Sequence, residues 1–171
     1  MLKVITRRLL INLSVILLCL NQVIWASDKD QQQPIYIDSD TASYDEKNSI
    51  STYSGNVIYR QGSLVIHSEM MIFHLKNGEI IKVVVSGKPI TFKQALGTDK
   101  EEMNGQALNA EYYPSTGKLL LMNQAIVKQN GNQANSDLIT YDTQNGLIQA
   151  GDISNSSKRV HTVFESKGKT K

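Results

Sequence analysis

Three histidines and one pair of aspartates are the residues whose types could support metal binding or acid–base chemistry. His67 and His74 are seven positions apart in one predicted strand, and this odd separation places them on opposite faces unless the strand bends between them; His161 is far away in the sequence. Asp38 and Asp40 share a face, as a carboxylate pair or a Ca²⁺ site would require. Asp40 is also one of a series of repeated acidic positions, which favours a turn or strand-end role. We therefore predict no metal site, no cofactor and no catalytic residue.

Nucleophile and phosphate-binding motifs do not change this prediction. Gly62-Ser63 lacks the flanking pattern of a nucleophile elbow. Gly87-Lys88 is followed by Pro89 rather than Ser or Thr. The first glycine of the P-loop pattern, which should stand upstream of Gly87, is also missing. The sequence predicts a protein that is not an enzyme.

The first 26 residues have the order of a secretory signal peptide. Basic residues are followed by an apolar run, Leu9 to Leu20, and then by Ile24-Trp25-Ala26, where a signal peptidase would cut. The run is shorter than the roughly 20 residues that a membrane-spanning helix needs. Two alternatives stay open: an uncleaved anchor, and acylation at Cys19, although Leu stands where a lipoprotein signal wants a small residue. We expect a secreted, soluble protein.

Cleavage changes both the charge and the cysteine content. Removing 26 of the 171 residues leaves 145, enough for one domain. Three basic residues leave with the segment, so 15 Lys and Arg face 16 Asp and Glu, and the net charge falls from +2 to −1. No basic face for nucleic acid is predicted. Cys19 is the only cysteine, so the mature chain has no thiol for a disulfide, a metal or a nucleophile.

The mature chain is predicted to be one all-β domain. Residues 27–33 form a polar lead-in that we expect to be flexible, residues 34–165 the domain, and residues 166–171 a basic, flexible tail. Turn signals occur at Gln61-Gly62, Asn77-Gly78, Thr116-Gly117 and Asn145-Gly146. Runs rich in β-branched and aromatic residues predict strands over residues 35–44, 49–53, 56–60, 64–75, 79–85, 90–94, 106–113, 118–122, 125–129, 133–141, 147–150 and 159–165. Residues 97–103 are expected to form a charged loop.

An internal repeat groups these strands into hairpin-like units. Ser39-Asp40, Ser68-Glu69 and Ser136-Asp137 are each followed four residues later by an aromatic residue and then by a turn and a glycine. Ala110-Glu111 begins a degenerate copy. Stacked units of this kind bury a core that no single unit could bury. The irregular spacing favours a coiled, jelly-roll-like stack of antiparallel strands over a strict β-helix.

Several strands are apolar on both faces. In residues 64–75, Leu64, Ile66, Met70 and Ile72 share one face, and Val65, Met71, Phe73 and Leu75 the other. A strand packed between two layers explains this pattern, and so does an interior wide enough to leave a groove for an apolar ligand. Met70, Met71, Met103 and Met122 suit a groove lining and an ordinary core equally well.

Motifs follow one another in a fixed order at residues 34–40, 54–62, 87–92, 105–113, 136–141 and 158–160. In this order they resemble the OstA-like family of periplasmic lipopolysaccharide-transport proteins, and the resemblance runs from about Gln33 to Phe164. It implies a twisted open β-jelly roll that holds the acyl chains of lipopolysaccharide. It also implies protomers that join head to tail, forming a bridge from an inner-membrane complex to an outer-membrane translocon, with movement driven by a cytoplasmic ATPase. Pro114, after Tyr112-Tyr113, should end or edge a strand.

The resemblance assigns residues to these roles. The expected lipid groove is lined by Ile35, Ile37, Val57, Tyr59, Ile66, Ile90, Phe92 and Tyr112. The N-terminal edge, Ile35, Tyr36, Ile37 and Asp38, is expected to receive a bitopic inner-membrane partner. The C-terminal edge is expected to meet the outer-membrane translocon and consists of Val160, His161, Thr162, Val163 and Phe164.

Three other interpretations remain open on the sequence. One is the bitopic inner-membrane partner of the same transport system, which keeps its N-terminal helix. Another is a secreted polysaccharide-active β-helical protein, which would need a catalytic carboxylate or a Ca²⁺ cluster. The last is a structural or adhesive β-repeat protein, which would form filaments without binding lipid.

Overall fold

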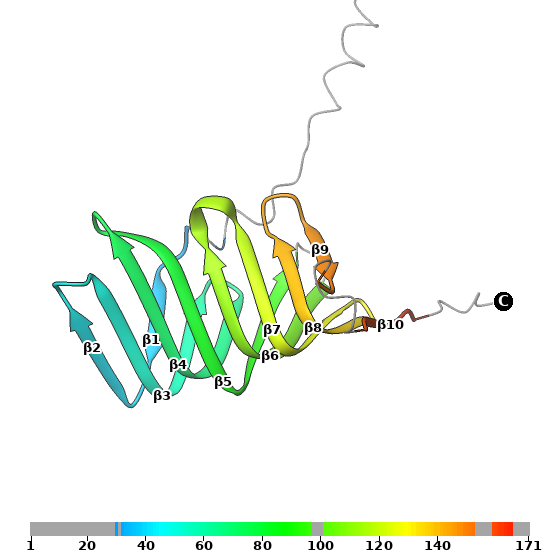
Figure 1. Cartoon of the computed structure of the whole chain (residues 1–171), viewed down its shortest axis with the longest axis horizontal. Coiled ribbons are helices and arrows are strands. Elements are labelled where there is room, and N and C mark those ends of the chain that lie inside the picture. The colour runs from blue at the N-terminus through cyan, green and yellow to red at the C-terminus, as the bar shows by residue number, and fades with distance from the viewer. Residues whose placement is uncertain (1–29, 31, 97–100, 153–158, 166–171) are drawn as a thin grey trace, which may run out of the picture.

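The computed structural model describes residues 30, 32–96, 101–152 and 159–165. They form one antiparallel sheet of ten strands, curled into an open trough with β1 and β2 at one end and β9 and β10 at the other (Figure 1). The prediction of an open, twisted all-β fold is confirmed. The predicted signal peptide and tail lie outside the described residues. The strands are β1 (Ile35–Asp38), β2 (Thr41–Asp45), β3 (Ile50–Gln61), β4 (Leu64–Lys76), β5 (Glu79–Leu96), β6 (Glu101–Tyr113), β7 (Lys118–Gln129), β8 (Asn132–Asp142), β9 (Leu147–Ala150) and β10 (His161–Val163).

Each long strand continues through a bend. The pairing register shifts between Ser54 and Val57 in β3, and in all the pairs up to β7 with β8 a corresponding shift lies at the same level of the sheet. Extra residues on one strand of an antiparallel pair kink it and increase its twist. Aligned shifts therefore fold the whole sheet along one line, and strands predicted as separate pairs, such as residues 49–53 and 56–60, are the two halves of one strand.

The bend divides the sheet into two facing halves, which we call leaf A and leaf B. Leaf A contains β2, β9 and residues 50–54, 70–76, 79–86, 109–113, 118–122 and 138–142; leaf B contains β1, β10 and residues 57–61, 64–68, 90–96, 101–107, 125–129 and 132–136. At each end of the sheet two short strands share one long partner. β1 and β2 both pair with β3, and β9 and β10 both pair with β8.

The bend also explains why β4 is apolar on both faces in the sequence. Ile66 and Ser68 face the interior before the bend, whereas Met71 and Phe73 do so after it, and Met71 and Phe73 are buried while Met70 is exposed. Two residues, Glu69 and Met70, lie between the inward positions 68 and 71, where a regular strand has only one, so the alternation shifts by one position. Neither a second covering layer nor a wide cavity is needed to explain the pattern. Even-numbered residues of β4 face the interior before the bend and odd-numbered residues face it after the bend.

Turn residues agree with the hairpins that they connect. Asn77 and Gly78 have φ of 54° and 82° in the two-residue turn between β4 and β5, as a type I′ turn requires. Asn130-Gly131 forms the same kind of turn between β7 and β8, with φ of 50° and 79°, although it was not among the predicted turns. Pro114 ends β6 as expected and starts a short 3₁₀ turn, Pro114–Thr116.

Two predicted boundaries and one predicted repeat position are wrong. Residues 35–44 are two strands, because the chain turns at Asp40, whose amide donates to the Gly55 carbonyl at 2.9 Å. Residues 101–103 belong to β6 rather than to a loop, since they pair with residues 94–96 of β5. The acidic repeat is also misassigned at one position. Glu111 lies in leaf A, and Leu108 occupies the bend of β6 where Glu69 occupies that of β4.

Candidate functional site

The interior between the leaves is a continuous apolar surface. In leaf B one row of paired inward positions crosses the sheet from edge to edge: Ile37, Tyr59, Ile66, Phe92, Gly105, Val127, Ala134 and Thr162. In leaf A the corresponding row is Tyr53, Met71, Val85, Ala110, Leu121, Ile139 and Ala150. The two rows face each other, so an apolar chain lying along the trough would meet hydrocarbon from both sides.

The structure places the eight predicted groove residues on this interior face, at different depths. Val57, Ile90 and Tyr59 are core residues, exposed by only 1%, 2% and 8%. Ile37, Ile66 and Phe92 are half-buried and pack against that core. Tyr112 is half-buried between Val83 and Leu119 in leaf A, and Ile35 is 41% exposed at the end of the trough. Whether these residues touch lipid stays a prediction.

Most of leaf A was missed by the sequence analysis. Met71, Phe73, Val85, Leu121 and Ile139 are all buried in the same core as the predicted residues. The available signal was the apolar alternation within each strand, which gives the inward face of each half once the position of the bend is known. When the position of the bend is unknown, it cannot be decided which residues in the second half of each strand face the interior.

Aromatic rings join the two leaves near the N-terminal end. Tyr59 of leaf B stacks on Phe73 of leaf A, with ring centroids 6.5 Å apart and planes at 26°. Tyr53 meets the same Phe73 ring edge to face at 5.7 Å. Stacked and edge-to-face pairs of this kind add to the free energy of burial.

Tyr59 keeps its hydroxyl satisfied within this apolar interior. The hydroxyl donates to Gln61 Oε1 at 2.7 Å. Burial, together with the nearby Tyr112 phenol, raises the pKa of Tyr59 to about 12. The interior therefore favours a neutral group, which is the property expected of a surface that holds hydrocarbon.

Little free volume remains between the leaves. A gap of about 10 Å³ is bounded by Phe92, Met103 and Val127 of leaf B and by five residues of leaf A: Leu119, Leu121, Ile139, Tyr141 and Ile148. This is about the space of one water molecule. An acyl chain would not fit into this gap unless the leaves separated there.

Phe92 has a specific neighbour in this interior. It pairs with Gly105, where a Cβ would come within 2.8 Å of the Phe92 ring. The glycine thus leaves room for the ring to lie over the backbone of β6. A larger residue at position 105 would displace the ring from this place.

The candidate catalytic or metal-binding residues do not assemble. The bend places His67 and His74 on the same outer face rather than on opposite faces, because the alternation shifts between them. Asp38 forms an ion pair with Arg60, and Asp40 accepts from Asn56 Nδ2 at 2.9 Å. Within the described ranges, no three His, Asp, Glu or Cys side chains come together as metal ligands would.

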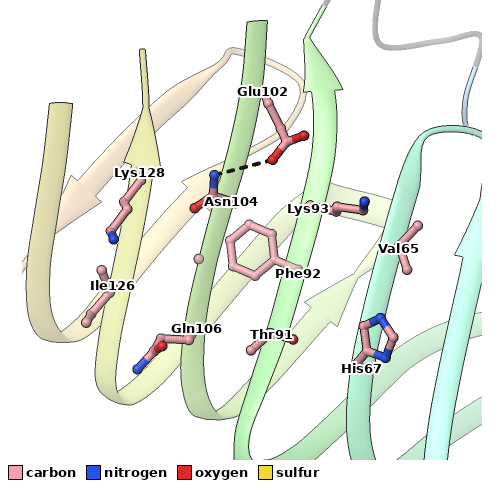
Figure 2. A pocket seen from close by; sticks show the side chains of 11 residues that line it. Val65, His67, Thr91, Phe92, Lys93, Glu102, Asn104, Gln106, Ile126 and Lys128 are labelled. Carbon is pink, nitrogen blue, oxygen red and sulfur yellow. Dashed lines mark hydrogen bonds between the residues drawn. The ribbon is translucent and has the colours of Figure 1, made fainter. Parts of the chain in front are cut away.

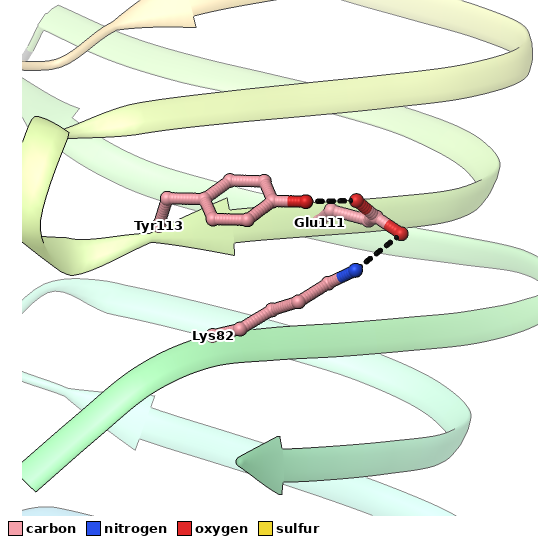
Figure 3. Close-up of polar contacts among 3 residues, drawn as sticks. All are labelled: Lys82, Glu111 and Tyr113. Carbon is pink, nitrogen blue, oxygen red and sulfur yellow. Dashed lines mark hydrogen bonds and ion pairs between the residues drawn. The ribbon is translucent and has the colours of Figure 1, made fainter. Parts of the chain in front are cut away.

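A charged cluster on the outer face of leaf A ties β5 to β6. Lys82 Nζ lies 2.9 Å from Glu111 Oε1, and the Tyr113 hydroxyl donates to Glu111 Oε2 at 2.6 Å (Figure 3). Lys82 also lies over the Tyr113 ring, 5.3 Å from its centroid. The hydrogen bonds from Tyr113 and Lys82 lower the pKa of Glu111, and the bond to Glu111 raises that of Lys82. The cluster is structural and stands away from the interior.

Both predicted partner edges lie at the ends of the sheet. Among the described strands, β1 pairs only with β3 and β10 only with β8, so each has one side that pairs with no described strand. Apolar side chains are exposed there, with Tyr36 and Ile35 at the N-terminal end and Val163 and Phe164 at the C-terminal end. Phe164 is 76% exposed. Val160 and Phe164 flank β10 rather than belonging to it.

Comparison with known proteins decides the family. Residues 36–147 match the family model described as LptA/(LptD N-terminal domain) LPS transport protein, which covers more than half of the 171 residues. The chain belongs to this family. It is similar to the lipopolysaccharide export system protein LptH of Pseudomonas aeruginosa, with 31% identity over 150 residues, 84% of this chain and 86% of that protein. It is also 34% identical to LptA of Escherichia coli K12 over 137 residues, 79% of this chain and 72% of that one.

The fold agrees with this family at the level of coordinates. The crystal structure of Pseudomonas aeruginosa LptH, described as the LptA-homologous periplasmic component of the lipopolysaccharide transport device, superposes with a TM-score of 0.72. The match covers 80% of this chain and 99% of LptH, at 31% identity. In the part of the chain that the structure describes, no helix has the length and apolar character to cross a membrane.

Proposed function

We propose that this protein carries lipopolysaccharide across the periplasm, with the acyl chains of the lipid held between leaf A and leaf B. The observation that carries the proposal is the pair of facing apolar rows, which run from one end of the sheet to the other. Each buried CH₂ group contributes about 0.8 kcal/mol, so a lipid with several acyl chains needs a continuous apolar shield in an aqueous compartment. Membership of the transport family supports the same role.

Lipid loading requires the two leaves to separate, and the sheet topology allows this with little loss of hydrogen bonds. Among the described strands, pairing runs only between neighbours along the sheet, and the leaves are joined through the bends. Opening the trough therefore breaks apolar and ring contacts, and lipid chains replace those contacts with their own.

The ends of the sheet supply the proposed assembly. An unpaired edge strand can accept a strand from another chain. β1 and β2 of one protomer receive β9 and β10 of the next, which makes the trough continuous from protomer to protomer. In the same way, residues 35–38 receive the bitopic inner-membrane partner, and residues 160–164 meet the outer-membrane translocon. The role uses no catalytic group, and a cleaved signal peptide over residues 1–26 delivers the chain to the periplasm.

A charge placed inside the trough tests the carrier role. Phe92→Asp should abolish co-purification of lipopolysaccharide with the protein from periplasmic extracts, because the carboxylate cannot be desolvated against acyl chains. Thr140→Asp is the matched control, since Thr140 lies on the outer face of leaf A opposite Leu120. Circular dichroism verifies that both variants keep the β structure. Undiminished lipid in a folded Phe92→Asp protein would refute the proposal, and Phe92→Leu, which keeps the apolar surface, should retain lipid if Phe92→Asp fails to fold.

A further inference from the structure

A hollow on the outer face of leaf B has a separate character from the interior. Its volume is about 340 Å³, and strands β4, β5, β6 and β7 form its floor (Figure 2). Two adjacent rows of outward side chains line it. One contains Lys93, Asn104 and Lys128, and the next contains Thr91 and Gln106. This volume lies at the small end of the range found for ligand sites.

Two lysines, Lys93 and Lys128, and one glutamate, Glu102, line the hollow and give it a formal charge of +1, from two positive groups and one negative group. Lys93 and Lys128 lie on either side of Asn104, on strands that flank β6, so their Cα atoms are separated by roughly 10 Å across the sheet. Neither forms an ion pair with another described residue, whereas Lys82, Lys88 and Arg60 all do. The hollow thus has one ammonium group on each flank, and Figure 2 shows both side chains extending away from Asn104.

The remaining lining combines hydrogen-bonding groups with apolar carbon. Asn104 Nδ2 donates to Glu102 Oε1 at 3.4 Å, and Thr91 and Gln106 add a hydroxyl and an amide. Val65, Ile126 and Phe92 contribute hydrocarbon. A few convergent polar groups over an apolar floor are typical of a small-molecule site.

We infer that this hollow binds a small anionic saccharide, a sugar ring that carries a phosphate or a carboxylate. The anion would lie between Lys93 and Lys128, whose exposed side chains would turn toward it and form charge-assisted hydrogen bonds. The hydroxyl groups would meet the side chains of Thr91, Asn104 and Gln106, and the C–H face of the ring would rest on the apolar floor. A simple anion would contact only Lys93 and Lys128, and a neutral sugar would contact only Thr91, Asn104 and Gln106.

The hollow opens on the outer face of leaf B, whereas the acyl chains in the proposed carrier role lie between the leaves. It is therefore a second site, which could take the saccharide portion of another lipopolysaccharide molecule or a free sugar phosphate. The chemistry recognised is the same in both cases.

Calorimetric titration of the mature protein tests the site with defined probes: glucose 6-phosphate, glucose, inorganic phosphate and the saccharide of lipopolysaccharide freed of its acyl chains. Glucose 6-phosphate should bind at least tenfold more tightly than glucose or phosphate. The double variant Lys93→Gln/Lys128→Gln should weaken it at least tenfold, and Lys118→Gln, at an exposed lysine in leaf A, should change it less than twofold. Backbone amide resonances of Asn104 and Gln106 should shift on binding, while that of Leu121 should not.

Either saccharide source supports the inference if its binding depends on the two lysines. Binding of the acyl-free saccharide assigns the site to lipopolysaccharide, and binding of glucose 6-phosphate alone assigns it to a soluble sugar. No saturable binding of any probe, equal binding of inorganic phosphate, or a double variant that behaves like Lys118→Gln would overturn it. None of these results would alter the carrier role, which is measured by lipid in the interior.

Discussion

The rings of Tyr59 and Phe73 stack at 6.5 Å although they belong to opposite halves of the folded sheet. Tyr59 pairs with Ile66 in leaf B, and Phe73 pairs with Val83 in leaf A. The contact therefore exists only because the long strands bend between the two leaves. It marks the N-terminal end of a trough whose leaves touch through apolar side chains.

Truncating Phe73 should destabilise the protein strongly. Phe73→Ala removes a buried ring that both Tyr53 and Tyr59 contact, and the expected loss is about 3–5 kcal/mol of unfolding free energy. Tyr44→Ala, at a tyrosine that is 60% exposed, should change it by less than about 0.5 kcal/mol. Urea unfolding followed by circular dichroism measures both, and equal effects would contradict the interleaf packing.

Alkaline pH should weaken the fold through Tyr59. Its pKa is raised from 10.0 to about 12, so the unfolded chain ionises first and the folded state holds the proton longer. The contribution of Tyr59 to the unfolding free energy is therefore constant below pH 10 and is lost between pH 10 and 12. Tyr59→Phe should remove part of that fall, seen as a flatter plot of unfolding free energy against pH. An unchanged slope of unfolding free energy against pH would show that burial does not hold the Tyr59 phenol in its neutral form.

Ser68 and Ser136 offer a comparison of two equivalent positions at the bend. Ser68 Oγ is buried with no hydrogen-bond partner among the residues that the structure describes, whereas Ser136 Oγ accepts from the Leu138 amide at 3.4 Å. An unsatisfied buried hydroxyl costs about 1–3 kcal/mol. Ser68→Ala should raise the unfolding free energy by about 1 kcal/mol, and Ser136→Ala should give no gain. A loss of stability in Ser68→Ala would mean that its hydroxyl is satisfied in solution.

Phe164 should support head-to-tail association. Phe164→Glu places a charge on the exposed C-terminal edge and should shift sedimentation of the protein towards monomer, raising the dissociation constant at least tenfold. Ile81→Glu changes an apolar residue that is 44% exposed but lies away from the terminal strands, so it should leave association unchanged. Oligomers that persist in Phe164→Glu would place the contact elsewhere.

Much of the fold follows from local signals in the sequence. Asn77-Gly78 predicts its hairpin because both residues adopt positive φ, and Pro114 predicts the end of β6 because it cannot continue the ladder. The ordered motifs around residues 34–40 and 54–62 also identify the family. Each of these features depends on residues close together in the chain.

The bend was not predictable in the same way. It arises from register shifts between neighbouring strands, and a register is a property of two segments rather than of one. Its position decides which residues of β4 face the interior, which is why Met71 and Phe73 were assigned to the face opposite Ile66. For the same reason Glu111 was taken as a member of the acidic repeat, although Leu108 occupies the bend.

Photo-crosslinking on adjacent residues of β8 tests the central claim most directly. A crosslinking amino acid at Tyr141 lines the gap between the leaves, and one at Thr140 lies on the opposite side of the same strand. With protein irradiated in periplasmic extracts, lipopolysaccharide should become attached at position 141 and not at position 140. Attachment at both positions, or at 140 alone, would contradict a carrier that holds lipid between its two leaves.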